Sequence, residues 1–333
     1  MILNNSQVID QTTAIERIPF KPGLIGALNL YKPETVRTDA ITFDVRENSL
    51  AILDDHLRNT AQKNSTEDQP YDIHTLAIPH YPISKSIGRE KLAGVRAFGK
   101  EGEAIVANAV AQELEAQAER HDVHEEYLKA AMTLSGVVVT AHYGTINMAT
   151  EFGVVRPTQA LTPATLLADI RSAMAKSKAG LKTGGRIQGY VALVGADLFE
   201  TILTSADVKT AYQFSQANGN PLRNELGVVA NGYTIFRFGN VDFILYDDTF
   251  TTKTGATVSV LADDAGVLVP RTTIGRTFYG PASTLSGLGG VGSRRFAQTY
   301  RDPKDRFIEV DSEQSTLVIN EQFGATVALS IGS

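Results

Sequence analysis

The chain has 333 residues, of which 43% are hydrophobic and 20% are charged, a balance typical of folded soluble proteins. It contains no cysteine, which excludes disulfides, thiolate nucleophiles and every zinc site that needs a thiolate ligand. A formal net charge of -6 disfavours a protein that holds nucleic acid through a basic face.

The N-terminal 20 residues, MILNNSQVIDQTTAIERIPF, lack a basic region followed by an apolar run, so the sequence predicts no signal peptide and synthesis in the cytoplasm. No stretch approaches the ~18 apolar residues of a membrane span, so no membrane contact is expected. Residues 1–28 form a polar arm in which Pro19 and Pro22 block an early helix. The alternation in TVRTDAITFDVRE, residues 35–47, then predicts a strand.

Residues 48–99 are polar, with prolines at 70, 79 and 82 and little apolar periodicity. A segment of this composition can bury little of itself, so we expect a long projecting loop or hairpin. Such a segment suits a protein in which neighbouring subunits supply the missing contacts.

Residues 100–134 contain no proline and are rich in Ala, Glu, Gln and Leu, which predicts a single helix about 50 Å long. A helical wheel places Val123 and Tyr127 on an apolar stripe that faces the core. The same wheel places Asp122 and Glu126 on a polar side.

Short strands and helices follow the long helix. Residues 162–180 predict a helix with Thr162 as N-cap, Pro163 at its first position and Gly180 at its end. YVALVG predicts a short apolar strand, ADLFETILTSADVKTAYQF a helix, and NELGVVANGYTIFRFGNVDFILYDDTF paired strands. The remainder is mostly β, so the predicted class is α+β.

The stretch HDVHEEY, residues 121–127, places His121, His124 and Glu125 at i, i+3 and i+4, where helical side chains share one face. Two imidazoles and a carboxylate can bind a metal ion, but their order departs from both H-E-x-x-H and H-x-x-E-H. A His/carboxylate metalloenzyme is therefore the weaker hypothesis. The stronger one is a half-solvated helix face near an inner or inter-subunit surface. If the two imidazoles have a special role there, it is a change of charge between pH 5 and 8 that alters subunit contacts.

The other motifs in the sequence do not indicate an enzyme. Residues 287–292 match G-x-G-x-x-G, and Glu309 stands where a ribose-binding acid would, but neither a preceding strand nor a following helix is predicted, so we expect a flexible glycine loop. The acid pairs at 54–55, 247–248 and 263–264 stand beside turn residues, and adjacent side chains point apart. No catalytic residue, metal ligand or cofactor is predicted.

Four ordered stretches span nearly the whole chain. They are KPGLIGALNLYK; SGVVVTAHYGTI; YVALVGADLFETILTSADVKTAYQF with NELGVVANGYTIFRFGNVDFILY; and VLVPRTTIGRTFYGP followed by YRDPKDRFIEVDSEQSTLVINEQFGATVAL. As an ordered set they resemble the lambda-type major capsid proteins of tailed bacteriophages, the phage major capsid protein E family.

The resemblance implies the Hong Kong 97 phage capsid fold. Its parts would be an N-terminal arm (1–28), a strand plus extended loop (29–99), a peripheral domain with a long spine helix and β-sheet (100–160), an axial α/β domain (161–250) and return strands that complete both domains (251–333). The implied function is a non-enzymatic head protein that assembles into pentamers and hexamers of an icosahedral shell enclosing double-stranded DNA. A tube or connector subunit of the virion is the alternative.

The resemblance also implies partners and a location. Portal and scaffold proteins would act during assembly in the host cytoplasm, a decoration protein is a common addition to such shells, and the product is the virion. Subunit contacts are expected from charged residues of the loop and the long helix: Asp54, Asp55, Arg58, Lys63, His121, His124 and Glu125.

Overall fold

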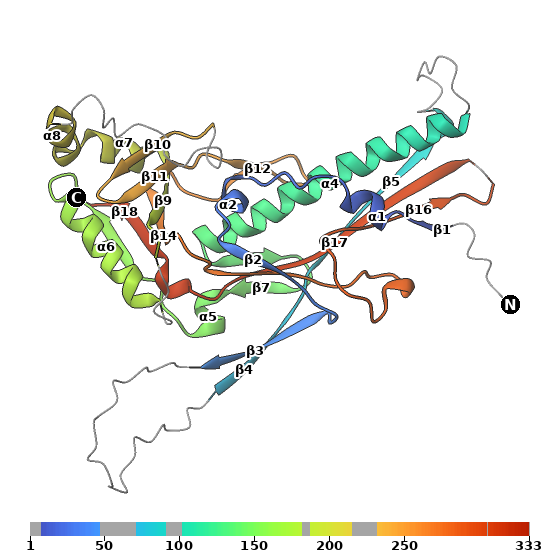
Figure 1. Cartoon of the computed structure of the whole chain (residues 1–333), viewed down its shortest axis with the longest axis horizontal. Helices are drawn as coiled ribbons and strands as arrows, with labels where there is room; N and C mark the ends of the chain where they lie inside the picture. The colour runs from blue at the N-terminus through green and yellow to red at the C-terminus, as the bar shows by residue number, and fades with distance from the viewer. Residues whose placement is uncertain are drawn as a thin grey trace, which may run out of the picture.

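The computed structural model describes residues 8–46, 71–90, 102–181, 187–214, 232–304 and 306–332. Strands and helices are mixed along the chain (Figure 1), so the predicted α+β class is confirmed. The α-helices with both ends in these ranges are α1 (Thr12–Glu16), α2 (Leu24–Ala27), α4 (Gly102–Leu134), α5 (Met148–Phe152), α6 (Leu166–Gly180), α7 (Ala196–Thr204) and α8 (Ala206–Phe214). None of them is long and apolar enough to cross a membrane.

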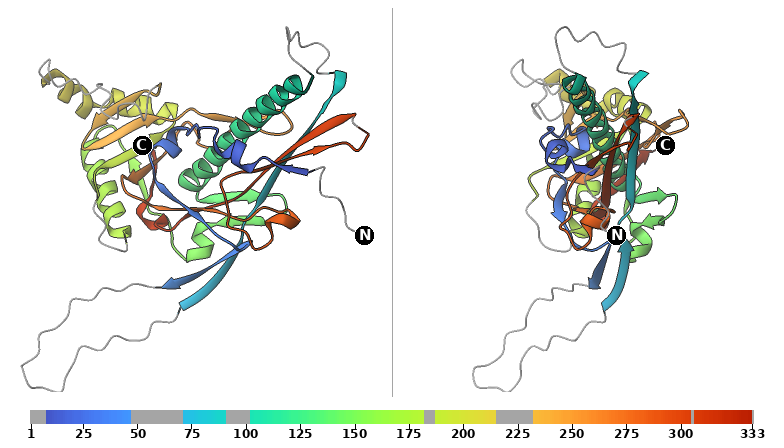
Figure 2. Two further views of the ribbon diagram at one scale, coloured as in Figure 1. Left: turned by 45° about the vertical axis from the view of Figure 1, so that its right-hand side comes forward. Right: turned by 90° about the vertical axis from the view of Figure 1, so that its right-hand side faces the viewer.

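The first sheet is built around one long strand, β17, against which α4 packs (Figures 1 and 2). Its order is β1-β16-β17-β15-β2, and β5 also pairs with β17. All pairs are antiparallel except β15 with β2. The strands are β1 (Val8–Asp10), β2 (Tyr31–Thr35), β5 (His80–Gly88), β15 (Gly275–Tyr279), β16 (Phe296–Arg301) and β17 (Phe307–Asn320).

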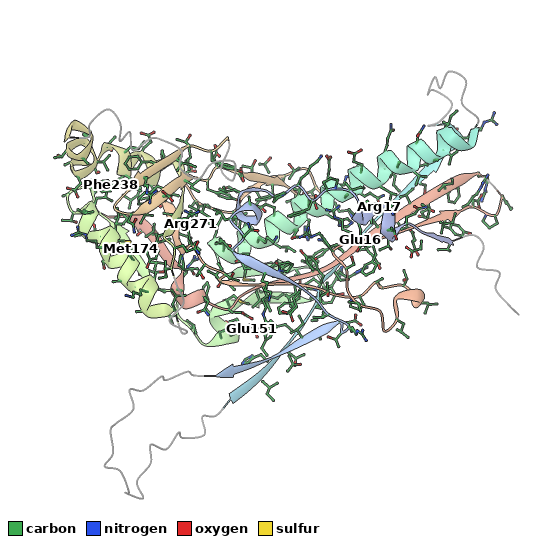
Figure 3. All side chains as sticks on the ribbon, in the orientation of Figure 1. Glu16, Arg17, Glu151, Met174, Phe238 and Arg271 are labelled. Atoms are coloured by element: carbon green, nitrogen blue, oxygen red, sulfur yellow. The ribbon has the colours of Figure 1, made fainter. Side chains whose placement is uncertain are left out.

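The second sheet has the order β10-β11-β9-β14-β18-β8. Every residue of β9 is buried, as a continuous apolar run predicts for a central strand. Helices α6 and α7 pack on this sheet; Figure 3 shows Met174 of α6 and Phe238 of β10 at this end of the molecule. The strands are β8 (Thr158–Leu161), β9 (Tyr190–Val194), β10 (Ile235–Phe238), β11 (Val241–Leu245), β14 (Ala265–Pro270) and β18 (Val327–Ile331).

Three two-stranded ribbons complete the described β structure: β3 (Ala40–Arg46) with β4 (Tyr71–Ala77), β6 (Val137–Thr140) with β7 (Gly144–Asn147), and β12 (Thr249–Thr251) with β13 (Thr257–Ser259). The β3–β4 ribbon projects from the body (Figures 1 and 2). Halfway along the ribbon, where Phe43 pairs with His74, the Phe43 ring contacts Phe152 and Phe278 edge-on. His74 of β4 lies 3.3 Å from the carboxylate of Glu151 on α5; Figure 3 labels Glu151.

The prediction that residues 48–99 form one projecting segment is wrong at its C-terminal end. Residues 80–88 form β5, which pairs with β17 from His80 opposite Ser315 to Gly88 opposite Phe307. The strand does alternate between less exposed and exposed residues. The alternation was hidden because one inward position is Lys85, whose ammonium group forms an ion pair with Glu113 of α4.

The helix boundaries agree in part with the sequence. Helix α4 ends at Leu134, and α6 ends at Gly180, as predicted. Helix α6 begins at Leu166 and not at residue 163. The reason is Asp169, whose carboxylate accepts the Thr162 N–H at 2.9 Å and holds the preceding residues in a turn.

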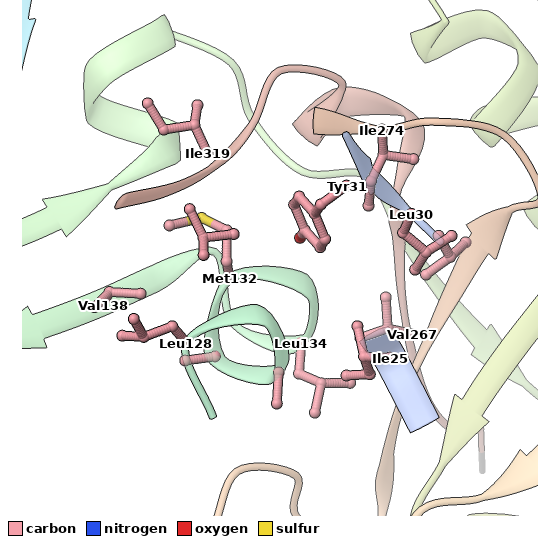
Figure 4. Close-up of a cluster of buried hydrophobic side chains, with 14 of the residues drawn as sticks. Ile25, Leu30, Tyr31, Leu128, Met132, Leu134, Val138, Val267, Ile274 and Ile319 are labelled. Carbon is pink, nitrogen blue, oxygen red and sulfur yellow. The ribbon is translucent and has the colours of Figure 1, made fainter. Parts of the chain in front are cut away.

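One buried apolar cluster joins the two sheets (Figure 4). It brings Met132 of α4 and Tyr31 of β2 together with Val267 of β14 and Ile319 of β17. Because strands of both sheets contribute to it, the long helix is packed against a core that the two sheets share.

Candidate functional site

The inward face of α4 is polar where it meets β17. Three side chains spaced four residues apart on the helix form hydrogen bonds with three residues spaced two apart on the strand. Gln117 Nε2 donates to the Val310 carbonyl at 3.0 Å, and His121 Nε2 pairs with Ser312 Oγ at 2.9 Å. Gln314 Nε2 of the strand donates to Glu125 Oε2 at 3.2 Å. Four helical residues rise about 6 Å and two strand residues about 6.6 Å, so the two spacings match over this length. We call this set the polar seam.

Charged pairs extend the polar seam. Glu125 is 0% exposed, and its carboxylate accepts from Lys129 Nζ at 2.6 Å and Tyr279 OH at 2.9 Å. Asp122 pairs with the buried Arg295 at 2.6 Å. Burial raises the pKa of Asp122 despite this arginine, because removal from water disfavours the charged form.

The two histidines of HDVHEEY do not act as predicted. Burial, with Arg295 nearby, lowers the pKa of His121 to about 3. Burial lowers the pKa of His124 to about 4. The His124 ring packs edge-on against that of Tyr81, with the ring centroids 4.1 Å apart. Both imidazoles are therefore neutral between pH 5 and 8, and the predicted change of charge in that range is wrong.

The same residues do not converge on a metal ion. His121 points to Ser312, His124 contacts Tyr81, and Glu125 is occupied by Lys129. In the part of the chain that the structure describes, no group of three or more His, Asp or Glu side chains is placed to hold a metal.

The helical wheel identified the buried side of α4 only in part. Tyr127 packs against the apolar cluster that joins the two sheets, as predicted, but Val123, Asp122 and Glu126 do not follow the wheel. Val123 is 58% exposed, whereas Asp122 and Glu126 are 3% and 5% exposed. The wheel fails because the surfaces facing α4 here offer hydrogen-bond donors and acceptors, so hydrophobicity does not mark the buried side. His121 and Glu125, at 1% and 0% exposed, do not form the half-solvated face that was predicted. The other expected contacts, Asp54, Asp55, Arg58 and Lys63, lie outside the described residues.

Carboxylates of α4 also hold the N-terminal segment. Glu126 accepts the backbone N–H groups of Ile25 at 2.6 Å and Gly26 at 2.9 Å, and Asp122 accepts that of Lys21 at 3.0 Å. A Cβ atom at Gly23 would lie 2.5 Å from Glu126 Cδ, so glycine is required for this close approach. The glycines in KPGLIGAL were the only sequence signal for this contact between the N-terminal segment and α4. They do not show that the partner is Glu126.

The glycine motif and the acid pair 247–248 have structural roles, whereas the acid pair 54–55 lies outside the described residues. Residues 287–292 lie in the connection between β15 and β16, two strands that are both part of the first sheet. The G-x-G-x-x-G pattern therefore lacks the helix that a dinucleotide site requires. Asp248 accepts a hydrogen bond from Tyr233 OH at 2.6 Å.

A long helix laid on a β-sheet, a second sheet with its own helices and a projecting ribbon define the Hong Kong 97 type of phage capsid fold. A solved structure supports this class: that of a candidate capsid protein of a prophage of E. coli CFT073, with a TM-score of 0.66, 12% sequence identity and coverage of 97% of this chain and 100% of that one.

The chain belongs to the phage major capsid protein E family, which it matches over residues 8–331. The major capsid protein of Pseudomonas phage KPP10 is 26% identical to it over 328 residues, which cover 93% of this chain and 92% of that protein. The family predicted from the sequence is thus confirmed. The chain is a structural capsid protein of the virion and not an enzyme.

Proposed function

We propose that copies of this chain assemble into pentamers and hexamers that close into an icosahedral shell around double-stranded DNA. Family membership over residues 8–331 supports a role in the capsid. The structural observation that carries the proposal is the β3–β4 ribbon, which reaches away from the body of the subunit (Figure 1). Phe43 packs the ribbon onto its own subunit, but Ile73 of β4 is 61% exposed. A two-stranded ribbon has little stability of its own in water, so a neighbouring subunit is the natural support for this exposed face.

The net charge of -6 fits this task. A strongly basic inner wall would bind phosphates tightly and hinder the movement of the genome. We further propose a portal protein and a separate scaffold protein as partners during assembly in the host cytoplasm. A decoration protein on the finished shell is an additional proposed partner.

The test is electron microscopy of the purified chain, alone and expressed together with its scaffold. Rings, sheets or closed shells are expected. A chain that stays monomeric at every scaffold and salt concentration would refute the proposal. Tubes, or a single ring with no shell, would instead support a tube or connector subunit.

A deletion can test the extended loop that the sequence predicts. It must spare β4 and β5, because β5 pairs along β17 in the first sheet. Replacing residues 47–70 by a short turn should leave thermal unfolding of the subunit nearly unchanged and prevent shell formation. Normal shells from this variant would show that the removed residues are not needed for contacts between subunits.

A further inference from the structure

The loop between β15 and β16 displays two leucines to solvent. Leu285 and Leu288 are 96% and 88% exposed, the largest values among the big hydrophobic side chains of the described residues. We call residues 283–290 the leucine spur. A contiguous apolar surface that lies open to water is a feature of contact sites between molecules.

Hydrogen bonds within the leucine spur and to β17 define its conformation. The Gly287 N–H donates to the Thr284 carbonyl and the Gly290 N–H to that of Gly287, both at 2.9 Å. At its base the Ser283 N–H donates to Glu313 Oε1 at 2.7 Å. A loop that is already ordered loses little conformational entropy when it binds, so its leucines are presented ready for contact.

A groove elsewhere on the subunit offers a matching apolar surface. It lies between α4 and the β12–β13 ribbon, has a volume of about 740 Å³ and includes Val123 and Val258, which are 58% and 38% exposed. Tyr127 and Phe250 also line it, with their rings packed edge-on at 5.3 Å. We call it the ribbon groove.

The charged side chains at the ribbon groove leave room for an apolar occupant, because Arg120 and Lys253 are exposed and can keep their charged ends in water. Arg120, Lys253 and Glu119 are among its lining residues, and Glu119 already pairs with Lys21. Residues 280–293, which contain the leucine spur, include no charged side chain. The spur can therefore enter without carrying a charge out of water, which a charged segment could not do without a partner for each charge.

We propose that the leucine spur of one copy packs Leu285 and Leu288 into the ribbon groove of a neighbouring copy, an inference that rests on the proposed assembly of this chain. Figure 1 separates the two surfaces: β12 lies above α4, and the orange loop that follows β15 extends below β17. The contact is therefore heterologous, with different surfaces on the two partners. Such contacts repeat from copy to copy and build rings or shells when the rotation closes.

Cysteine cross-linking tests the contact directly, because the chain has no cysteine of its own. Val123→Cys and a size-tagged Leu288→Cys are mixed, assembled and oxidised, and the products are separated on a non-reducing gel. A mixed covalent dimer in clear excess over the dimers of either variant alone is expected. Shells that assemble without this dimer would overturn the inference. The same holds if assembly protects the thiol at position 123 from reaction with a maleimide but gives no mixed dimer, because another segment would then fill the groove.

Removal of the leucines gives a second measurement. Leu285→Ser/Leu288→Ser should raise the concentration needed for assembly by roughly tenfold or more, because the apolar contact is lost. Both side chains are exposed, so thermal unfolding of the subunit should not change. Val155→Ser is the matched control, since Val155 is 87% exposed outside the spur and the groove.

These outcomes separate the inference from the proposed function. A wild-type chain that never assembles refutes the proposed function and the inference with it. A wild-type chain that assembles, while the double serine variant does so at the same concentration, refutes the inference alone.

Discussion

The polar seam and the strand β9 are equally buried but are built from opposite kinds of side chain. Val191 to Val194 are 0% to 1% exposed, and Gln117, His121 and Glu125 also lie between 0% and 1%. Around β9 the stabilisation comes from apolar area removed from water, which has no preferred direction. In the polar seam each buried group needs a particular partner, and a misplaced partner costs more than a correct one contributes.

The difference assigns separate tasks to the two regions. Apolar packing around β9 supplies stability, whereas the polar seam fixes the register of α4 on β17. A shift of α4 by one turn would move His121 away from Ser312 and Glu125 away from Gln314. Since buried polar groups left without partners are expensive, other registers are disfavoured even though the seam itself contributes little net stability.

The largest effect is expected from breaking a charged pair beside the polar seam. Arg295→Met leaves the carboxylate of Asp122 buried without its cation, and we expect a loss of about 3–5 kcal/mol in the free energy of unfolding. Urea denaturation of the subunit measures it. Asp122→Asn/Arg295→Met should recover a large part of the loss, because the Asn amide oxygen can still accept the Lys21 N–H. A double variant as unstable as the single one would show that the arginine acts through packing and not through charge.

The matching experiment in the apolar region is Leu193→Ala. Leu193 is 0% exposed in the centre of the second sheet, so the cavity should reduce the free energy of unfolding by about 2–5 kcal/mol. Leu193→Met nearly conserves volume and should cost less than about 1.5 kcal/mol. The loss of unfolding free energy at position 193 would then depend on the volume of the side chain and not on a charged partner. A loss from Leu193→Met as large as that from Leu193→Ala would contradict this view.

A moderate effect is expected from acidification. The folded-state pKa values of His121 and His124 are about 3 and about 4, below the unfolded value of about 6.5. Between these pKa values the unfolded chain binds more protons than the folded chain does. The free energy of unfolding therefore falls as pH falls. From pH 6 to pH 5 the loss should be about 1 kcal/mol per histidine, or about 2 kcal/mol for the pair.

The control for this pH dependence must separate histidines from carboxylates. Burial raises the pKa of Asp122 and of Glu126, which favours the folded state on acidification and opposes the histidine effect. His121→Gln/His124→Gln should therefore flatten the decline of stability between pH 6 and pH 5. His142→Gln, at an exposed residue, should leave the slope as in the wild type. An unchanged slope in the double variant would exclude the two buried imidazoles as its source.

The same contrast explains what the sequence could reveal. YVALVG identified β9 because a continuous apolar run has one simple burial pattern. The long helix was predictable from its composition, but its buried face was not, since Gln117, His121 and Glu125 have the polarity of surface residues. Their partners on β17 are almost 200 positions away along the chain. Strand β5 was missed for the same reason, because the salt bridge of Lys85 with Glu113 could not be inferred from local pattern.

The smallest effect on stability is expected at the residue that the helical wheel assigned to the core. Val123 is 58% exposed, so Val123→Ser should change the free energy of unfolding by no more than about 0.5 kcal/mol. Leu128→Ala, at a neighbouring position on α4 that is 3% exposed, should cost about 2–5 kcal/mol. A large loss from Val123→Ser would restore the wheel's apolar stripe as the buried face. A small loss, together with weaker assembly, would show that this valine serves a contact between subunits and not the fold of one.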